Sequence, residues 1–435
     1  MRILVVGNGA REDALCWRLA ASPSCEAIFC APGNAGTAMR GTNWDIAATD
    51  GKKIAKRARE EKIDLAVLGP ETAIAAGVGD QLREACIATF GPDRAPGRLE
   101  SSKIFSKRFM ERHGVPTARA VVVHSLDGAL KALDEWKHSG CVLKADGLAA
   151  GKGVVVASEV QTARAVVSDW YKHNRVPGGG SDLLLEERLT GREVSVFAIS
   201  DGRAMLPIAA ACDYKRAGDG DTGPNTGGMG AYSPPSGFSE DMFDQVRARI
   251  LAPVLRGLLA EGLLYVGVLY CGLMWTEAGP SVIEFNARFG DPETQVLMPR
   301  VRGDFAALLK SAADGALDTT AASFSEEACV GVVLVTPDYP KSSAPMRGLN
   351  VDVSLAGGQQ VFWGASTRKG SGVDSAGGRV MTVTATGASV EEARVLAYDG
   401  VREVTARFEA QAHLSCRSDI AADIEERNQR ASPAI

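Results

Sequence analysis

Residues 144–157 read KADGLAAGKGVVVA, which places a glycine-rich loop between two short apolar runs. A P-loop has two glycines separated by four residues, followed by Lys and then by Ser or Thr. Here three residues separate Gly147 from Gly151, and Gly153 follows Lys152 at the position of the metal-binding hydroxyl. The loop also joins two predicted strands, whereas a P-loop leads into a helix. These differences exclude a P-loop.

Two interpretations of this loop remain, a nucleotide-binding flap and a simple glycine-rich turn. A glycine loop between antiparallel strands can fold over a triphosphate, because its backbone N–H groups can point at the phosphates. Lys152 in the loop and Lys144 at the end of the preceding strand would add positive charge. The surrounding segment is small enough to move as a lid, which favours the flap.

The first hundred residues alternate helical patterns with short β-type runs at 3–6, 27–30, 65–68 and 87–90. This alternation is typical of a parallel sheet with helices on both faces. We therefore predict an N-terminal parallel α/β domain, with ligand loops at the carboxyl edge of its strands.

The turn GNGARE follows the first of these strands and has two glycines of a dinucleotide-binding fingerprint. Two features exclude that function: position 12 is Glu12 instead of a third glycine, and no acidic residue ends the second strand to hold a ribose. The turn could still hold an anion or a sugar phosphate at a helix N-terminus, through the amides around Asn8 and Gly9. The alternative is a plain strand-to-helix turn.

A second motif, VIEFNARFGDPETQ, occupies residues 282–295. Side chains alternate between the two faces of a strand, so Val282 should share a face with Glu284, Asn286 and Arg288. Carboxylate and amide oxygens suit a hard cation such as Mg²⁺, and the guanidinium could hold a carboxylate or a developing phosphoryl charge. The alternative is a surface strand whose polar side chains face solvent, but the specialised continuation FGDPETQ argues against it.

A third stretch, LLLEERLTGREVSVF at residues 183–197, gives a weaker indication. A strand ending in Glu186 and Glu187 could offer backbone groups to an adenine edge, and Glu193 could bind ribose hydroxyls. Runs of this kind are more often solvated faces.

The composition excludes several classes of protein. A net charge of −5 argues against a general nucleic-acid binder, and no run is long and apolar enough to predict a membrane span. The nine cysteines include no Cys-x-x-Cys pair, which favours a reduced, cytoplasmic protein. None of the five histidines lies in a glycine-rich or acidic cluster, so a histidine-ligated zinc and a Ser-His-Asp triad are improbable. The chemistry must therefore rest on Lys, Arg, Asp, Glu and Asn.

A chain of 435 residues is too long for one ordinary domain. We predict an N-terminal α/β domain at 1–102 and a central domain at 103–325, which contains a lid subdomain at about 118–190. A small mixed α+β domain follows at 326–435.

Together these motifs resemble the ATP-grasp superfamily, and within it the phosphoribosylamine–glycine ligase family, also called glycinamide ribonucleotide synthetases. Further stretches that carry the resemblance are APGNAGTA, SSKIFSK, DTGPNTGGMGAYSP and GGRV, so it covers nearly the whole chain. It implies a pre-ATP-grasp domain, an ATP-grasp domain with a mobile lid, and a small C-terminal domain. The implied reaction is purine-biosynthetic: ATP phosphorylates glycine, and the amine of 5-phosphoribosylamine attacks the glycyl phosphate.

The resemblance also implies a role for individual residues, with ATP and Mg²⁺ (or Mn²⁺) as cofactors. We expect a monomer. The expected metal ligands are Glu284 and Asn286, and the expected catalytic residues are Arg288, Lys215 and Asp213. The expected ATP contacts are Lys103, Lys144, Gly151, Lys152, Gly153, Glu186, Glu187, Leu189 and Glu193. The expected contacts to glycine, its acyl phosphate or the phosphoribosylamine are Asn8, Gly9, Arg11, Glu12, Asp213, Lys215, Arg288, Asp291, Thr294 and Arg379.

The chain departs from the family pattern at three places on the expected amine side. Asp13 and Tyr214 stand where the family usually has histidine, and GASTRKG at 364–370 replaces a usual Gly-Thr-Lys element. Asp13 could repel a sugar phosphate unless an arginine compensates. We therefore keep one alternative, a related ligase that activates glycine or a similar amino acid for a different amine. A non-catalytic protein with the same fold is disfavoured, because the ATP, metal and glycine motifs are intact.

Overall fold

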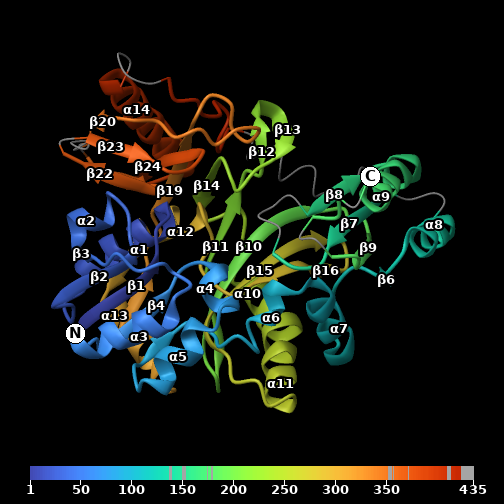
Figure 1. Cartoon of the computed structure of the whole chain (residues 1–435), viewed down its shortest axis with the longest axis horizontal. Coiled ribbons are helices and arrows are strands. Elements are labelled where there is room, and N and C mark those ends of the chain that lie inside the picture. The colour runs from blue at the N-terminus through green and yellow to red at the C-terminus, as the bar shows by residue number, and fades with distance from the viewer. Residues whose placement is uncertain are drawn as a thin grey trace.

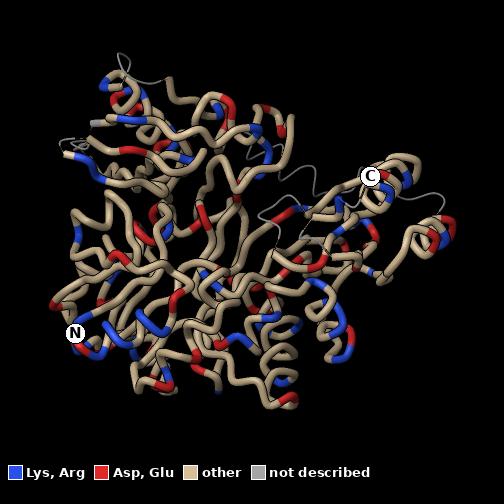
Figure 2. Tube along the Cα trace, viewed as in Figure 1, with Lys and Arg blue, Asp and Glu red and all other residues tan. Residues whose placement is uncertain are grey.

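The computed structural model describes residues 1–136, 140–148, 153–173, 175–177, 180–350, 355, 357–370, 372–408 and 413–422. Figure 1 shows a large body, which holds the N-terminal, central and C-terminal segments, and a smaller lobe that projects from it. Among these residues, no helix combines the length and apolar character needed to cross a bilayer. Figure 2 shows basic and acidic residues intermixed along the described part of the trace.

The N-terminal segment forms a five-stranded sheet in the order β3-β2-β1-β4-β5, and every neighbouring pair is parallel. Its strands are β1 (Arg2–Gly7), β2 (Ala27–Pro32), β3 (Thr42–Asn43), β4 (Leu65–Leu68) and β5 (Thr89–Phe90), and its helices are α1 (Ala10–Ala20), α2 (Thr37–Arg40), α3 (Gly51–Glu60), α4 (Glu71–Ala75) and α5 (Val78–Glu84). The apolar run at 3–6 is fully buried in the middle of the sheet. The predicted fold class is confirmed here, although the short edge strand β3 was not predicted.

The projecting lobe is a four-stranded antiparallel sheet in the order β6-β9-β7-β8, with two helices packed on each other. Its elements are β6 (Ala120–Val123), α8 (Leu126–Glu135), β7 (Cys141–Ala145), β8 (Val154–Ala157), α9 (Val160–Lys172) and β9 (Leu183–Glu187). It has a hydrophobic core of its own. The glycine loop joins β7 to β8, which pair from Lys144 and Val154 outward, so the predicted strand-to-strand connection is confirmed.

A single eight-stranded sheet forms the middle of the body, in the order β16-β15-β10-β11-β14-β19-β24-β21. Its strands are β10 (Arg192–Asp201), β11 (Met205–Asp213), β14 (Gly230–Ser233), β15 (Val266–Thr276), β16 (Gly279–Asn286), β19 (Ala328–Val335), β21 (Gln359–Trp363) and β24 (Arg379–Gly387). Because β14 pairs with β19, the sheet continues from the central segment into the C-terminal one.

The remaining strands pair in small separate sheets, β12 with β13, β17 with β18, and β20-β23-β22, and the remaining helices pack around the larger sheets. The helices are α6 (Arg98–Ser101), α7 (Lys103–His113), α10 (Glu240–Val246), α11 (Ala252–Ala260), α12 (Glu293–Leu297), α13 (Phe305–Ala313) and α14 (Val390–Phe408), and the strands are β12 (Arg216–Gly218), β13 (Thr222–Asn225), β17 (Val301–Gly303), β18 (Ala322–Phe324), β20 (Leu349–Asn350), β22 (Ser366–Lys369) and β23 (Gly372–Ser375). The single long helix predicted over 239–261 is divided by a π-helical turn at Arg247–Leu251.

Candidate active site

Strand β16 carries the predicted metal ligands, and its register explains their orientation. Glu284 pairs with Gly272 but Val282 pairs with Leu273, so Ile283 is an extra residue in the ladder. The shift reverses the alternation between Val282 and Glu284. Val282 is fully buried, while Glu284 and Asn286 stay partly accessible on the other side of Phe285. The prediction that Val282 shares a face with Glu284 is therefore wrong, because sequence alternation cannot reveal a bulge.

The carboxylate of Glu284 is held in its ionised form by surrounding ammonium groups. Burial alone would raise the pKa of Glu284, but Lys215, Lys144 and Lys103 outweigh it and lower the pKa. No described residue donates a hydrogen bond to this carboxylate, and the amide oxygen of Asn286 accepts only a long one, 3.4 Å from Nη2 of Arg288. Two oxygen ligands with spare acceptor capacity fit a Mg²⁺ ion that keeps waters and phosphate oxygens in its other positions.

Arg288 is fixed by two acidic residues that the sequence motifs did not single out as site residues. Its Nη2 lies 2.9 Å from Oε1 of Glu100, and its Nε lies 3.2 Å from Oε2 of Glu71. Burial would lower the pKa of Arg288, but these carboxylates outweigh it and raise the pKa. Glu100 also accepts the N–H of Ala287, 2.8 Å away. Glu71 follows β4 directly, so its place at the carboxyl edge of the parallel sheet was the available signal.

Lys144 connects the projecting lobe to β16. Its Nζ donates to the carbonyl of Ile283 at 2.8 Å and lies 2.6 Å from Oε2 of Glu186. The other oxygen of Glu186 lies 2.8 Å from Nζ of Lys107, which is only 2% exposed. Lys144 thus stands beside Glu284 with its charge partly balanced, and the side chain of Glu186 lies inside the lobe junction. Lys107, a lysine on a buried helix face, was missed.

The base of the glycine loop is attached to the start of α7. Asp146 accepts hydrogen bonds from Oγ of Ser102 and from the N–H of Ile104, both at 3.1 Å. Nζ of Lys103 donates to the carbonyl of Gly147 at 2.9 Å, and burial lowers the pKa of Lys103.

On the far side of the loop, the carbonyl of Gly153 accepts the N–H of Ala145 at 2.8 Å. The predicted phosphate contacts Gly151 and Lys152 lie outside the described residues. Lys103 and Lys144 therefore remain as the described cations at the base of the flap.

The predicted adenosine edge follows the last strand of the lobe. Glu187 is exposed, and its N–H bonds to the carbonyl of Arg119 at 2.9 Å, while Leu189 is half-buried beyond the strand. Glu193 forms an ion pair with Lys215. The side chain of Glu193 is 42% exposed, so it remains accessible to a ligand despite this pair.

The turn after β1 is occupied by its own glutamate. Oε2 of Glu12 accepts the N–H of Gly9 at 2.5 Å, and its Oε1 lies 2.6 Å from Nε of Arg11. Asn8 is exposed beside them. An anion at this turn could therefore not use the Gly9 amide as predicted, because a protein carboxylate already binds it. Arg11 is the positive group that remains next to the turn.

A second arginine joins the FGDPETQ turn to the C-terminal segment. Nη1 of Arg379 lies 3.2 Å from Oδ1 of Asp291 and donates to the carbonyls of Asp291 and Gly227, at 2.9 and 2.7 Å. Burial would raise the pKa of Asp291, but Arg379 and Arg11 outweigh it and lower the pKa. Oγ1 of Thr294 donates to the carbonyl of Gly290 at 2.5 Å, which turns this side chain toward its own loop.

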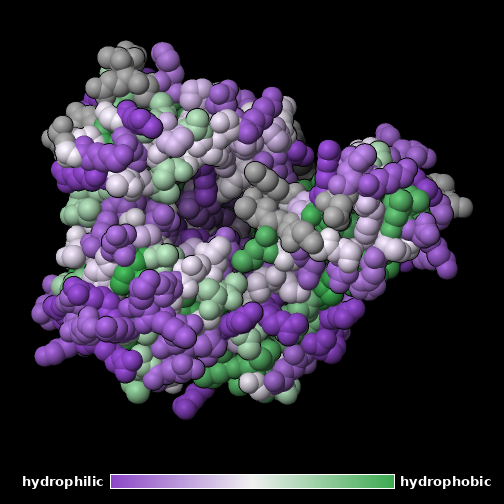
Figure 3. Space-filling model, viewed as in Figure 1, coloured by the Kyte–Doolittle hydropathy of each residue, from purple (hydrophilic) through white to green (hydrophobic). Residues whose placement is uncertain are grey.

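Asp213 and Lys215 lie at the end of β11 near these groups. Desolvation raises the pKa of Asp213 to about 7, with Lys215 opposing the rise and Glu293 adding to it. Desolvation would lower the pKa of Lys215, but Asp213 and Glu193 outweigh it and raise the pKa. A carboxylate with a pKa near neutrality can accept a proton from an amine during attack. Figure 3 shows a hollow lined by hydrophilic side chains in the body, below the C-terminal strands.

The departures Asp13 and Tyr214 both point away from this acid–lysine pair. Oδ2 of the fully buried Asp13 accepts the N–H of Trp363 at 2.8 Å, so it contacts the C-terminal strand β21. Tyr214 is also fully buried, and its hydroxyl accepts the N–H of Ala421 at 2.8 Å. In the segment 364–370, Oγ of Ser366 accepts the N–H of Ala35 at 3.3 Å. The residues at all three departures therefore form contacts between segments that are distant in the sequence.

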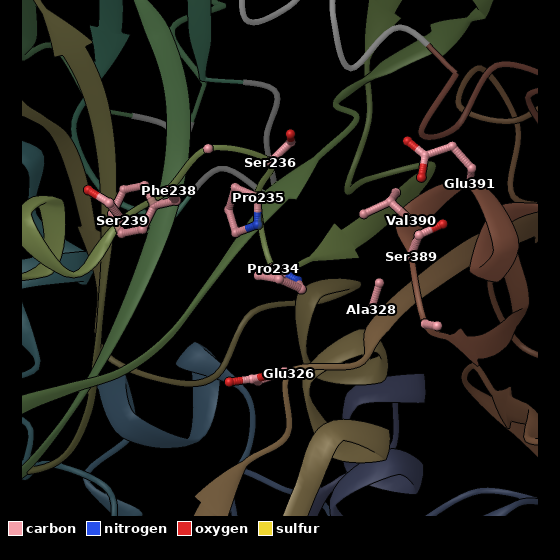
Figure 4. A pocket seen from close by; sticks show the side chains of 12 residues that line it. Pro234, Pro235, Ser236, Phe238, Ser239, Glu326, Ala328, Ser389, Val390 and Glu391 are labelled. Atoms are coloured by element: carbon pink, nitrogen blue, oxygen red, sulfur yellow. The ribbon is translucent and has the colours of Figure 1, made fainter.

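A separate pocket of about 440 Å³ lies between the loop after β14 and the start of α14. Figure 4 shows Pro234, Pro235 and Phe238 on one side and Ser389 and Val390 on the other. It shares no lining residue with the predicted site, and its charged lining residues are Glu326 and Glu391. A pocket with acidic groups and no basic ones does not suit a nucleotide.

Comparison with known proteins gives a consistent result over most of the chain. Three family models match: phosphoribosylglycinamide synthetase N domain at residues 1–100, its ATP-grasp (A) domain at 101–294 and its C domain at 329–423. The phosphoribosylamine–glycine ligase of Rhizobium meliloti is 42% identical over 408 residues, which are 93% of this chain and 95% of the relative. The Escherichia coli K12 protein of the same name is 42% identical over 92% of this chain and 94% of its own.

Solved structures agree with this comparison. The phosphoribosylamine–glycine ligase of Thermotoga maritima superposes with a TM-score of 0.83 at 30% identity, over 97% of this chain and all of that chain. A biotin carboxylase domain from Hydrogenobacter thermophilus, crystallised with MgADP, gives a TM-score of 0.71 at 14% identity, over 100% of this chain and 99% of that chain. That likeness concerns the fold alone.

Proposed function

Because the chain belongs to the phosphoribosylglycinamide synthetase family, we propose that it joins glycine to 5-phosphoribosylamine at the expense of ATP, giving glycinamide ribonucleotide, ADP and phosphate in purine biosynthesis. The observation that carries this function is the row Glu284, Asn286 and Arg288, whose carboxylate is stabilised by the ammonium groups of Lys103, Lys144 and Lys215. Phosphoryl transfer needs mainly positioning and charge neutralisation. A site made of cations, carboxylates and one amide supplies both.

In the first step, a carboxylate oxygen of glycine attacks the γ-phosphorus of ATP, and ADP leaves. Lys103 and Lys144, which bond to the carbonyls of Gly147 and Ile283 at the base of the flap, would neutralise phosphate charge. Arg288 is held by Glu71 and Glu100, and its Nη1, which donates one hydrogen bond to the carbonyl of Phe289, would offer its second N–H to the glycine carboxylate or its acyl phosphate. Mg²⁺, held by Glu284 and Asn286, would supply further charge neutralisation when bound.

In the second step, the amine attacks the acyl carbon of glycyl phosphate, phosphate leaves and the amine nitrogen loses a proton. Asp213, with a pKa of about 7, is the group that would accept this proton. Lys215, Arg11 and Arg379 would attract the phosphate of the amine substrate, with Asp291 and Thr294 shaping the glycine side. Because Asp13 and Tyr214 face other parts of the chain, they give little support to a different amine acceptor.

The direct test measures product with each amine. The purified protein with ATP, Mg²⁺ and glycine should release ADP quickly when freshly made 5-phosphoribosylamine is added, and mass spectrometry should detect glycinamide ribonucleotide. Stimulation by another amine, with none by phosphoribosylamine, would overturn the proposed acceptor. Repeating the assay with Mn²⁺ tests whether that ion also supports turnover.

We also infer a monomer that acts in a reducing cytoplasm. One chain supplies the candidate groups from its N-terminal, central and C-terminal segments, so no second copy is needed to complete the site. All nine cysteines are free, and six of them are buried, as expected where thiols stay reduced. Light scattering after size-exclusion chromatography tests the monomer, and a mass near 45.7 kDa is expected.

A further inference from the structure

The segment 415–421, here called the C-terminal clasp, lies against the hairpin of β12 and β13. It is tied to the large sheet by a bridge between Ser415 and Val335. Figure 1 shows this hairpin at the upper edge of the body, beside the C-terminal strands. The clasp is about 200 residues away in sequence from the hairpin it contacts, so its contacts are tertiary.

Arg417 is the centre of the clasp. Its side chain is only 1% exposed and lies 2.8 Å from Oδ1 of Asp221 and 2.6 Å from Oδ2 of Asp419. Its Nη1 also donates to the carbonyl of Arg216 at 3.1 Å. The guanidinium carbon lies 4.9 Å from the ring centre of Tyr214, within the range of a cation–π contact. A buried guanidinium with this many partners has one defined position.

Neighbouring residues of the clasp bond to the same hairpin. The N–H of Ser418 donates to Asp219 at 2.9 Å, and the N–H of Gly220 donates to Asp419 at 2.8 Å. The N–H of Ala421 donates to the hydroxyl of Tyr214 at 2.8 Å. The clasp therefore holds both the tip of the hairpin and Tyr214, which lies just before β12.

The two ends of this hairpin carry groups of the proposed amine site. Tyr214 stands between Asp213 and Lys215, and neighbouring side chains of an extended segment point to opposite sides. Fixing Tyr214 in the core therefore fixes Asp213 and Lys215 on the site side. At the other end, the N–H of Thr226 donates to the carbonyl of Lys215 at 2.8 Å, and the carbonyl of Gly227 accepts Arg379.

We propose that the C-terminal clasp positions the amine substrate: Arg417 and Tyr214 hold the hairpin so that Asp213 and Lys215 face the reacting amine. This proposal rests on the proposed function. Neither residue touches substrate, so both are positioning residues. Among the described residues, the groups of β16 and of the lobe form no hydrogen bond or ion pair with the clasp, so the effect of losing the clasp should fall on the second step.

The test uses the full chain with two clasp variants and a matched control. Arg417→Met removes the buried ion pairs, while Tyr214→Phe keeps the ring and removes the hydroxyl that accepts the N–H of Ala421. Arg402→Met replaces an arginine of α14 that is 71% exposed and pairs with Asp399. Circular dichroism and unfolding midpoints establish which variants fold, and the milder Tyr214→Phe keeps the test valid if Arg417→Met does not.

In each folded clasp variant, KM for phosphoribosylamine should rise by about tenfold, because one or more buried hydrogen bonds are lost. KM for ATP and for glycine should stay within about twofold of the wild type, and more ADP should form per glycinamide ribonucleotide. Arg402→Met should behave as wild type. An equal rise in KM for all three substrates would overturn the proposed role of the clasp. So would an unchanged KM for phosphoribosylamine in Tyr214→Phe. Failure of the wild type to make glycinamide ribonucleotide would instead refute the proposed function.

Discussion

Asp13 offers a sharp test of the electrostatics at the contact between the N-terminal and C-terminal segments. Its Oδ2 accepts the N–H of Trp363, its Oδ1 accepts no hydrogen bond from a described residue, and Nε of Arg40 is 3.8 Å away. Burial therefore raises the pKa of Asp13 from 3.8 to about 6, although Arg40 and the Trp363 N–H oppose the rise. The perturbation is Asp13→Asn, which keeps an acceptor for Trp363 and cannot ionise.

The magnitude follows from the difference between the folded and unfolded pKa. Between about pH 4 and pH 6 the folded state keeps a proton that the unfolded state has lost, so the free energy of unfolding falls as pH rises through this window. A tenfold difference in acidity is worth about 1.4 kcal/mol. Ionised Asp13 thus costs about 3 kcal/mol above pH 7, and about 1 kcal/mol at pH 4.5.

Asp13→Asn should therefore be more stable than the wild type, and its advantage should grow from about 1 to about 3 kcal/mol between pH 4.5 and pH 8. Urea unfolding at each pH, followed by tryptophan fluorescence and circular dichroism, measures this difference. Asp45→Asn, at an exposed position of the same segment, is the control for the change in net charge. An advantage that does not change with pH, or a variant less stable throughout, would refute a buried ionised carboxylate as the cause.

Three further changes test other contacts. Glu284→Ala should lower Mg²⁺-dependent ATP turnover by about 10²-fold or more, with an unchanged circular dichroism spectrum. Near-normal turnover would contradict the metal assignment. Glu277→Ala, at an exposed position, is the control. Gly36→Ala would place a Cβ 1.9 Å from Oδ2 of Asp13 and should destabilise the protein by about 1–3 kcal/mol in urea unfolding. Combining it with Asp13→Ala should remove most of that loss, and simple additivity would count against the clash. Asp146→Ala should loosen the base of the flap and raise the ADP formed per product, so fully coupled turnover would argue against a lid role.

Much of the fold could be predicted because its signals are local. The apolar run at 3–6 predicts a buried parallel strand, and the sequence around the glycine loop predicts a strand on each side of it, and both are confirmed. The extra residue at Ile283 and the π-helical turn at Arg247–Leu251 could not be predicted. They depend on how neighbouring strands and helices pack, and the sequence of one element does not contain that information.

The same limit applies to the candidate site. Sequence motifs indicated the residues that would face ligands, such as Glu284 and Arg288. They did not indicate the residues that hold them, since Glu100 and Lys107 act through partners many positions away. Glu12 was expected at the amine substrate, but it binds the Gly9 amide of its own turn. Such supporting pairs become visible only when the segments are brought together.

The positions of Asp13 and Tyr214 show that these two departures from the family pattern affect contacts within the chain. A negative charge facing a sugar phosphate would weaken binding of the amine substrate, but the Asp13 carboxylate is buried against the Trp363 backbone, and Gly36 leaves room for it. Tyr214 likewise contacts the C-terminal segment, since its hydroxyl accepts the N–H of Ala421 and its ring forms a cation–π contact with Arg417. Both departures change how the C-terminal segment is held against the rest of the chain. Differences there can therefore alter the alignment of Asp213 and Lys215 while the set of groups that would meet the amine stays the same.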